Sequence, residues 1–288
     1  MKLSTRYLLP AIAALGMTAP AMAQPGIWEV RDKDSSIWLF GSFHILPEGA
    51  EWRTGLFDTI LNDADKVVFE TDVSSAAMAT IGAEAFARGI YVDGTMLTDV
   101  IGEDTEAKLR QQANLIGLQV GPVLAMKPWM ATNAITVAAL TAQGYDQQGV
   151  EFVLQPELAP ERMVFLESGD QQLEVLAGAP EDPQIAMLES TLDEIPTLSK
   201  QMEQMLGSWA DGTPERLAEM FKIEMGGYES AFLDRLLYAR NRNWMAPLHT
   251  MLADNQENLV VVGAAHLIGD GSVLDLLAKA GYAVERVQ

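Results

Sequence analysis

Two segments near opposite ends of the chain share one pattern, and this pattern limits the folds the chain can adopt. Each segment has an apolar run, then glycine, two residues, histidine and an aliphatic residue; they are Ile37–Ile45 and Val260–Leu267. The whole chain contains only three histidines, and two of them, His44 and His266, follow this pattern. We interpret the two segments as an internal pseudo-repeat of strand and bend. In α/β folds, ligands bind beyond the carboxyl ends of such strands.

The residues at these strand ends point to a metal site. Glycine permits a tight bend there, and a histidine just after the bend faces the crevice. Two other apolar runs end in acids, Glu70 and Glu167. His44 and His266 could therefore share one cation, with one or both carboxylates completing the ligands. Such a nitrogen and oxygen set suits Zn, Mn, Co or Fe.

Each of these residues also has a structural interpretation. A single histidine after a strand often serves only as a hydrogen-bonding residue. Glu70 could open the turn at Thr71–Ser75, and Glu167 could stabilise the start of a helix at Gly169–Leu176. His249 lacks the preceding glycine, so we interpret it as structural. The matched pattern around two histidines is what favours a site.

The coarse pattern predicts a mixed α/β fold rather than two linked domains. No linker rich in glycine, serine or proline divides the chain. We expect strands at Ile27–Val30, Ser36–Phe40, Lys66–Glu70, Met163–Leu166, Asn258–Val262 and Tyr282–Val287. We expect helices at Glu51–Ala64, Ser75–Arg88, Glu103–Leu115, Trp129–Ala142, Val150–Leu158 and Gly271–Ala280, with a largely helical insertion over about 171–255.

The amino-terminal segment predicts export from the cytoplasm. Residues 1–23 combine Lys2 and Arg6 with a short apolar run and end in Ala21-Met22-Ala23. This arrangement is typical of a signal peptide cleaved after Ala23, which leaves a domain over 24–288. No later run is long and apolar enough to span a membrane, so we expect a periplasmic or secreted protein.

Composition excludes several classes of function. There is no cysteine, which removes disulfides, thiolate metal sites and cysteine nucleophiles. Lys and Arg total 19 against 40 Asp and Glu, a formal charge of −21. A chain this acidic repels phosphate backbones, so we expect no nucleic-acid partner.

Several segments together resemble the TraB/GumN (TraB/PrgY/GumN) family, which is related to the Tiki metalloproteases. The likeness spans about Ile27 to Val287, and the second Gly-x-x-His block is its most specific part. The segments that carry it are Gly41–His44, Lys127–Trp129, Arg240–Met245, Gly263–Gly269, Leu274–Leu277 and Ala280–Tyr282.

The resemblance implies two small α/β halves that bring both Gly-x-x-His motifs to one metal. His44 and His266 would be metal ligands, and Glu70 a ligand or general base. Arg240 and Asn241 would face the site. The relation to Tiki proteins implies metal-dependent peptide hydrolysis, with Mn or Co as the expected metals.

One departure concerns the residue before the Arg-Asn pair. The family often has glutamate there, whereas this chain has Ala239. We expect this change to remove a possible acidic partner of Arg240.

Our main hypothesis is a metal-dependent hydrolase, a peptidase acting on a peptide or small-molecule substrate. Glu70 or Glu167 would accept the water proton, and Arg240 with Asn241 would stabilise the oxyanion. The alternative is a non-catalytic periplasmic protein that binds a peptide or pheromone. A third hypothesis is haem or metal handling in the periplasm, and it rests only on the occurrence of related folds in haem-binding proteins. The oligomeric state is open.

Overall fold

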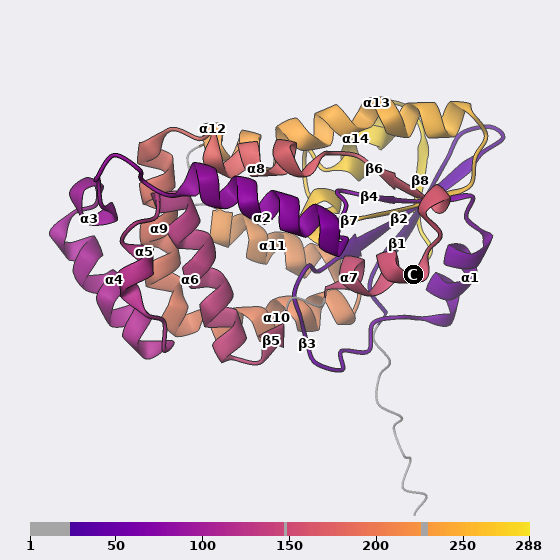
Figure 1. The fold of residues 1–288 in the computed structure, drawn as a ribbon. Coiled ribbons are helices and arrows are strands. Elements are labelled where there is room, and N and C mark those ends of the chain that lie inside the picture. The colour runs from indigo at the N-terminus through magenta and orange to yellow at the C-terminus, as the bar shows by residue number, and fades with distance from the viewer. Residues whose placement is uncertain (1–23, 147–148, 226–229) are drawn as a thin grey trace, which may run out of the picture.

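The protein combines a mixed sheet, covered by helices on both faces, with a group of helices that extends to one side (Figure 1). The computed structural model describes residues 24–146, 149–225 and 230–288. The expected signal peptide, 1–23, lies outside the described residues. Figure 1 shows the sheet at the right and the extending helices at the left.

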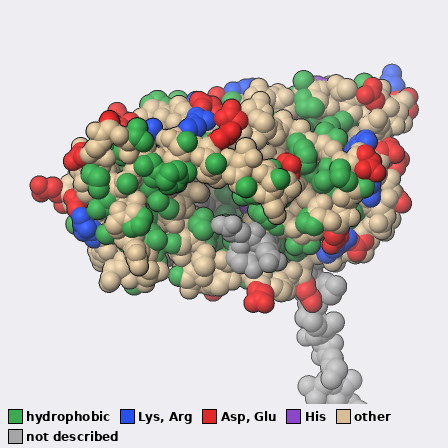
Figure 2. Space-filling model, viewed as in Figure 1, with side chains coloured by type: hydrophobic (Ala, Val, Ile, Leu, Met, Phe, Trp, Pro, Cys, Tyr) green, Lys and Arg blue, Asp and Glu red, His purple; other side chains and the backbone are tan. Residues whose placement is uncertain are grey.

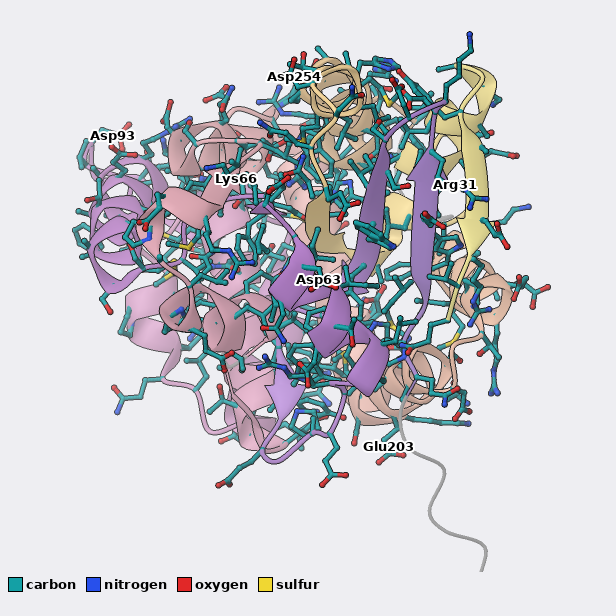
Figure 3. All side chains as sticks on the ribbon, turned by 90° about the vertical axis from the view of Figure 1, so that its right-hand side faces the viewer. Arg31, Asp63, Lys66, Asp93, Glu203 and Asp254 are labelled. Carbon is teal, nitrogen blue, oxygen red and sulfur yellow. The ribbon has the colours of Figure 1, made fainter. Side chains whose placement is uncertain are left out.

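The main sheet has six strands in the order β6-β4-β7-β2-β1-β8. Their bounds are Ile27–Arg31 (β1), Ser36–Ser42 (β2), Lys66–Phe69 (β4), Met163–Phe165 (β6), Asn258–Gly263 (β7) and Ala283–Arg286 (β8). Strands β6, β4, β7 and β2 are mutually parallel, whereas β1 pairs antiparallel with both β2 and β8. The carboxyl ends of four strands therefore share one edge. Figure 3 views the molecule from the right-hand side of Figure 1. It labels Lys66 at the start of β4 and Arg31 at the end of β1.

The interior of the sheet is apolar because its central strands are covered on both faces. All six residues of β7 are buried, and its Leu-Val-Val-Val run is typical of a covered parallel strand. One face packs on helices α13 (Ala239–Ala253) and α14 (Val273–Lys279). The other face packs on α1 (Gly55–Asp63), α7 (Val150–Leu154), α10 (Leu198–Ala210) and α11 (Pro214–Met225).

The extending helices have apolar cores of their own. One core joins residues of α3 (Leu97–Val100), α4 (Glu103–Leu115), α5 (Val120–Val123), α6 (Pro128–Ala142) and α9 (Glu181–Glu194). A second core joins α6 and α9 to α2 (Ser75–Gly89), α8 (Gly169–Ala177) and α12 (Ser230–Leu233). These helices lie beyond the carboxyl-terminal edge of the sheet in Figure 1.

Local sequence explains where several helices begin. The side chains of Thr54, Ser74, Ser168 and Ser272 each accept a hydrogen bond from a backbone N–H in the first turn of a helix. Thr54 explains why α1 begins at Gly55 and not at Glu51. Helix α6 begins at Pro128, where proline has no N–H to leave unpaired.

The mixed α/β class predicted from the sequence is confirmed. The six expected strands are all present, and both Gly-x-x-His motifs belong to the same sheet. The sequence did not indicate the small second sheet of β3 (Leu46–Pro47) and β5 (Tyr145–Asp146). Within the described residues, no helix has the length and apolar character needed to cross a membrane.

Candidate functional site

Four parallel strands deliver four of the predicted site residues to one edge of the sheet. Glu167 follows β6, Glu70 follows β4, His266 follows β7 and His44 follows β2. Strand register keeps the ends level: Phe69 pairs with Phe165 and Val261, and Ser42 pairs with Gly263. The six residues singled out by the sequence, Arg240 and Asn241 included, lie in one connected cluster.

Glu70 is the centre of this cluster. Its Oε1 accepts a hydrogen bond from the Gly263 N–H at 2.7 Å and lies 3.7 Å from His266 Nε2 and 4.0 Å from His44 Nε2. Its Oε2 accepts from Arg240 Nη2 at 2.5 Å and from Gln172. Burial opposes the charge of Glu70, but the neighbouring cationic groups outweigh it and lower its pKa to about 2. The carboxylate is therefore ionised at neutral pH.

Arg240 joins Glu70 to the second acid, Glu167. Its Nε lies 2.9 and 3.0 Å from the two Glu167 oxygens, so one guanidinium binds both carboxylates. Glu167 also accepts from the Trp244 indole at 2.9 Å, and the guanidinium lies 5.1 Å from the Trp244 ring centre. Burial opposes the charge of Arg240, but the two carboxylates outweigh it and raise its pKa. Glu70 is thus the acid nearer the histidines, and Glu167 anchors the arginine.

His266 is buried and held at both ring nitrogens. Asn241 Nδ2 donates to the Gly271 carbonyl, so its Oδ1 is left to accept from His266 Nδ1, at 2.5 Å. Nε2 then carries a lone pair, and Arg240 Nη1 lies 3.2 Å from it. The Trp244 ring packs on the imidazole with centroids 4.3 Å apart. Burial lowers the pKa of His266 to about 4, so the ring is neutral at pH 7.

His44 differs from His266 in being exposed and in having its pKa raised. Its side chain is 57% exposed, and its Nδ1 lies 3.1 Å from Oε1 of the buried Glu151. A carboxylate only accepts hydrogen bonds, so Nδ1 carries the hydrogen and Nε2 faces Glu70. The Glu151 charge raises the pKa of His44 to about 9.

A π-helical segment, Asp234–Tyr238, precedes the arginine on α13. Such segments shift the register of a helix and are frequent at functional sites. From this register, the consecutive residues Arg240 and Asn241 reach Glu70 and His266 respectively. Arg240 has two acidic partners, so Ala239 in place of the family's glutamate does not leave it unpaired.

The two glycines of the repeated motif are needed for close approach. A Cβ on Gly263 would lie 3.2 Å from both Glu70 Oε1 and His44 Nε2. A Cβ on Gly41 would lie 3.1 Å from the backbone of Ala264, in the second motif. Each glycine thus makes room for the other half of the pseudo-repeat.

The donor chemistry of this cluster fits a borderline divalent cation. Both imidazoles are held through Nδ1 and present Nε2 toward the Glu70 carboxylate, as histidine ligands normally do. Two donors on one tetrahedral cation at about 2.1 Å lie about 3.4 Å apart, somewhat closer than the 3.7 and 4.0 Å found here. As they stand, no three histidine or acidic side chains in the described residues form a ready metal cage. A cation would also have to displace Arg240 Nη1 from His266 Nε2.

An open groove of about 550 Å³ adjoins the cluster on the Glu167 side. It is bordered by α2, the edge strand β6 and the start of α8; Thr71, Ile81, Phe165 and Glu167 are among its lining residues. Figure 2 shows the face of the molecule seen in Figure 1, where hydrophobic side chains gather at the left and at the right and a hollow lies near the centre, on the other side of α2 from this groove.

The whole described domain matches a known family. The TraB/PrgY/gumN family matches over residues 26–286, which is nearly all of the chain after the expected signal peptide.

This chain belongs to the TraB/PrgY/gumN family.

Two proteins similar in sequence to this TraB/PrgY/gumN chain are the uncharacterized protein YbaP of Escherichia coli (strain K12) and the uncharacterized protein YbaP of Shigella flexneri. Each is 24% identical to it over 246 residues, which cover 83% of this chain and 86% of the relative. No solved structure matches the chain.

Sequence reasoning missed one residue of the candidate site in this TraB/PrgY/gumN family member, Glu151. It contacts His44 and, through a short hydrogen bond from the hydroxyl, Ser42. The available signal was a lone acid inside the apolar run Val150–Leu154, just after Gly149. Asn241 was expected at an oxyanion, but both of its polar atoms are engaged, with His266 and Gly271.

Proposed function

We propose that this protein is a metal-dependent hydrolase, a peptidase, whose cation is held by His44, His266 and Glu70. The observation that carries the proposal is the placement of two imidazole Nε2 atoms around one carboxylate oxygen. Each ring is also held at Nδ1, by Glu151 or Asn241. Such outer partners fix the tautomer that leaves Nε2 free to bind a metal.

The charge of the cluster also supports a bound cation. Three carboxylates, those of the buried Glu70 and Glu151 and of the partly buried Glu167, face only the Arg240 guanidinium and the His44 imidazole, whose pKa is raised to about 9. Buried charges without partners are costly. A divalent cation would balance the excess negative charge, and Mn, Co, Zn and Fe are the candidates for this donor set.

A bound divalent cation lowers the pKa of a coordinated water and polarises a carbonyl oxygen. Glu70 is the carboxylate closest to both imidazoles, so we assign it the role of proton acceptor as well as ligand. Glu167 holds Arg240 in place. Nη1 is the Arg240 nitrogen without a carboxylate partner, and it would serve a developing oxyanion once free of His266.

The groove beside the cluster supports a peptide substrate. Strand β6 lies at the edge of the sheet and lines the groove, so its outer backbone can pair with an extended chain. The residues 1–23 support a location in the periplasm or outside the cell, after cleavage behind Ala23.

The test is a peptide library incubated with the metal-free mature protein and with protein supplied with Mn, Co, Zn or Fe. We expect metal-dependent cleavage by the wild type and none by the His44→Ala/His266→Ala double variant. His249→Gln is the matched control, because His249 lies on α13 against Tyr282, outside the cluster. It should cleave like the wild type.

Two outcomes would contradict the proposal. Cleavage by a metal-free, folded double variant would remove the histidines from the reaction. Peptides that are retained by the wild type but never cut, with every metal, would instead identify a peptide-binding protein.

A further inference from the structure

Glu151 is a buried acid that enters the proposed function only as the Nδ1 partner of His44, and its contacts indicate a more specific role. It lies in the first turn of α7 and is only 3% exposed. Its Oε1 receives two hydrogen bonds, one from Ser42 Oγ and one from His44 Nδ1. Both donors belong to the first Gly-x-x-His motif. The contact therefore ties this motif to an acid more than a hundred positions further along the chain.

The backbone around Glu151 is shaped to hold this contact. A Cβ on Gly149 would lie 2.2 Å from the carbonyl carbon and oxygen of His44, so only glycine fits there. One residue later, the Val150 N–H donates to the Phe43 carbonyl at 3.1 Å. The start of α7 thus lies directly on the backbone of the motif, which fixes where the Glu151 carboxylate can reach.

The second oxygen of Glu151 argues against a purely structural role. Within the described residues, Glu151 Oε2 is buried and has no hydrogen-bond partner. A buried acceptor without a partner reduces stability, and a neutral side chain of the same shape would avoid much of this cost. A carboxylate kept under these conditions indicates that its charge serves His44.

The two imidazoles of the cluster differ in the partner that each has at Nδ1. His266 Nδ1 donates to a neutral amide oxygen of Asn241, whereas His44 Nδ1 donates to a charged carboxylate. A carboxylate partner makes imidazole a stronger electron donor through Nε2. It also keeps the hydrogen on Nδ1, so that Nε2 is the nitrogen that can lose its proton to bind a cation.

We propose that Glu151 is the positioning residue of His44. It accepts the Nδ1 hydrogen and orients the ring with Nε2 toward Glu70, so that Nε2 is the atom that would give up its proton and bind a cation. This inference rests on the proposed function, because the cation is the one held by His44, His266 and Glu70.

The test is a Co²⁺ titration of the metal-free mature protein, followed by the visible absorption of the bound ion. We expect Glu151→Gln to bind Co²⁺ about 10- to 100-fold more weakly, with an altered spectrum, because loss of an outer-shell partner has this effect. Glu151→Asp retains the charge and should recover part of the affinity. Glu157→Gln is the matched control and should leave both readouts unchanged, since Glu157 is exposed and pairs with Arg53.

His44→Ala separates failure of this inference from failure of the proposed function. If His44→Ala weakens Co²⁺ binding while Glu151→Gln and Glu151→Asp both keep wild-type affinity and spectrum, the role of Glu151 is wrong and the metal site stands. If His44→Ala itself binds Co²⁺ as the wild type does, the metal site and this inference both fail. Urea unfolding of each variant establishes that the titrated protein is folded.

Discussion

At the scale of single residues, one guanidinium holds the site together. Arg240 is 14% exposed and binds Glu70 and Glu167, which are themselves buried. Removing one member of a buried ion pair leaves the other charges without compensation. The arrangement of the site therefore depends on Arg240.

Arg240→Leu should lower the free energy of unfolding by about 3–5 kcal/mol, the usual effect of breaking a buried ion pair. Arg242→Leu is the control, because Arg242 is two residues away on the same helix but exposed, where it pairs with Asp234. Its effect should stay below about 1 kcal/mol. Urea denaturation at neutral pH measures both, and equal losses in the two variants would contradict the role of Arg240.

Acid should destabilise the metal-free protein in two overlapping ranges of pH. Burial holds the pKa of His266 at about 4, below its ordinary 6.5, so stability falls as the pH drops from 6.5 to 4. The pKa of Glu70, about 2 against an ordinary 4.5, adds a further loss below pH 4.5. Each group contributes on the order of 1–3 kcal/mol.

Urea unfolding at a series of pH values in the presence of a chelator measures this loss. Glu70→Gln should remove the part below pH 4.5, because the amide does not titrate. An unchanged slope in that variant would show that another group causes the acid sensitivity.

At the scale of elements, the six strands of the sheet could be predicted from the sequence, whereas their order and the contacts of α7 could not. The strands are short apolar runs, and the rule that parallel strands align their carboxyl ends placed Glu70, Glu167 and the two histidines together. The contact between Glu151 and Ser42 spans 109 residues, and no local pattern indicates such a partner. The π-helical register before Arg240 likewise depends on packing and not on local propensity.

Gly149→Ala should destabilise the protein by about 1–3 kcal/mol, because the new methyl group overlaps the backbone of His44. It should also weaken metal binding, since α7 and Glu151 must move away. Gly82→Ala is the control, because Gly82 lies in α2 with open space around it. Alanine there should raise the free energy of unfolding by about 0.5–1 kcal/mol. Thermal and urea unfolding compare the two, and a neutral Gly149→Ala variant would contradict the close approach.

At the scale of the whole molecule, the site lies where the sheet meets the extending helices (Figure 1). One Gly-x-x-His motif comes from the second strand and the other from the seventh, and β2 and β7 pair directly in parallel. The pseudo-repeat seen in the sequence thus becomes two neighbouring strand ends. The packing of α2–α6 against α8, α9 and α12 was outside the reach of sequence reasoning, because helical periodicity shows an apolar face but not its partner.

We propose that these two strand ends form one metal site, and metal analysis of the purified mature protein tests this proposal. Wild type and the His44→Ala/His266→Ala double variant are dialysed in parallel against Mn, Co, Zn and Fe, and bound metal is measured per chain. We predict about one ion per wild-type chain and none in the folded double variant. No metal in the wild type after dialysis against every cation, or equal metal in both proteins, would contradict the claim.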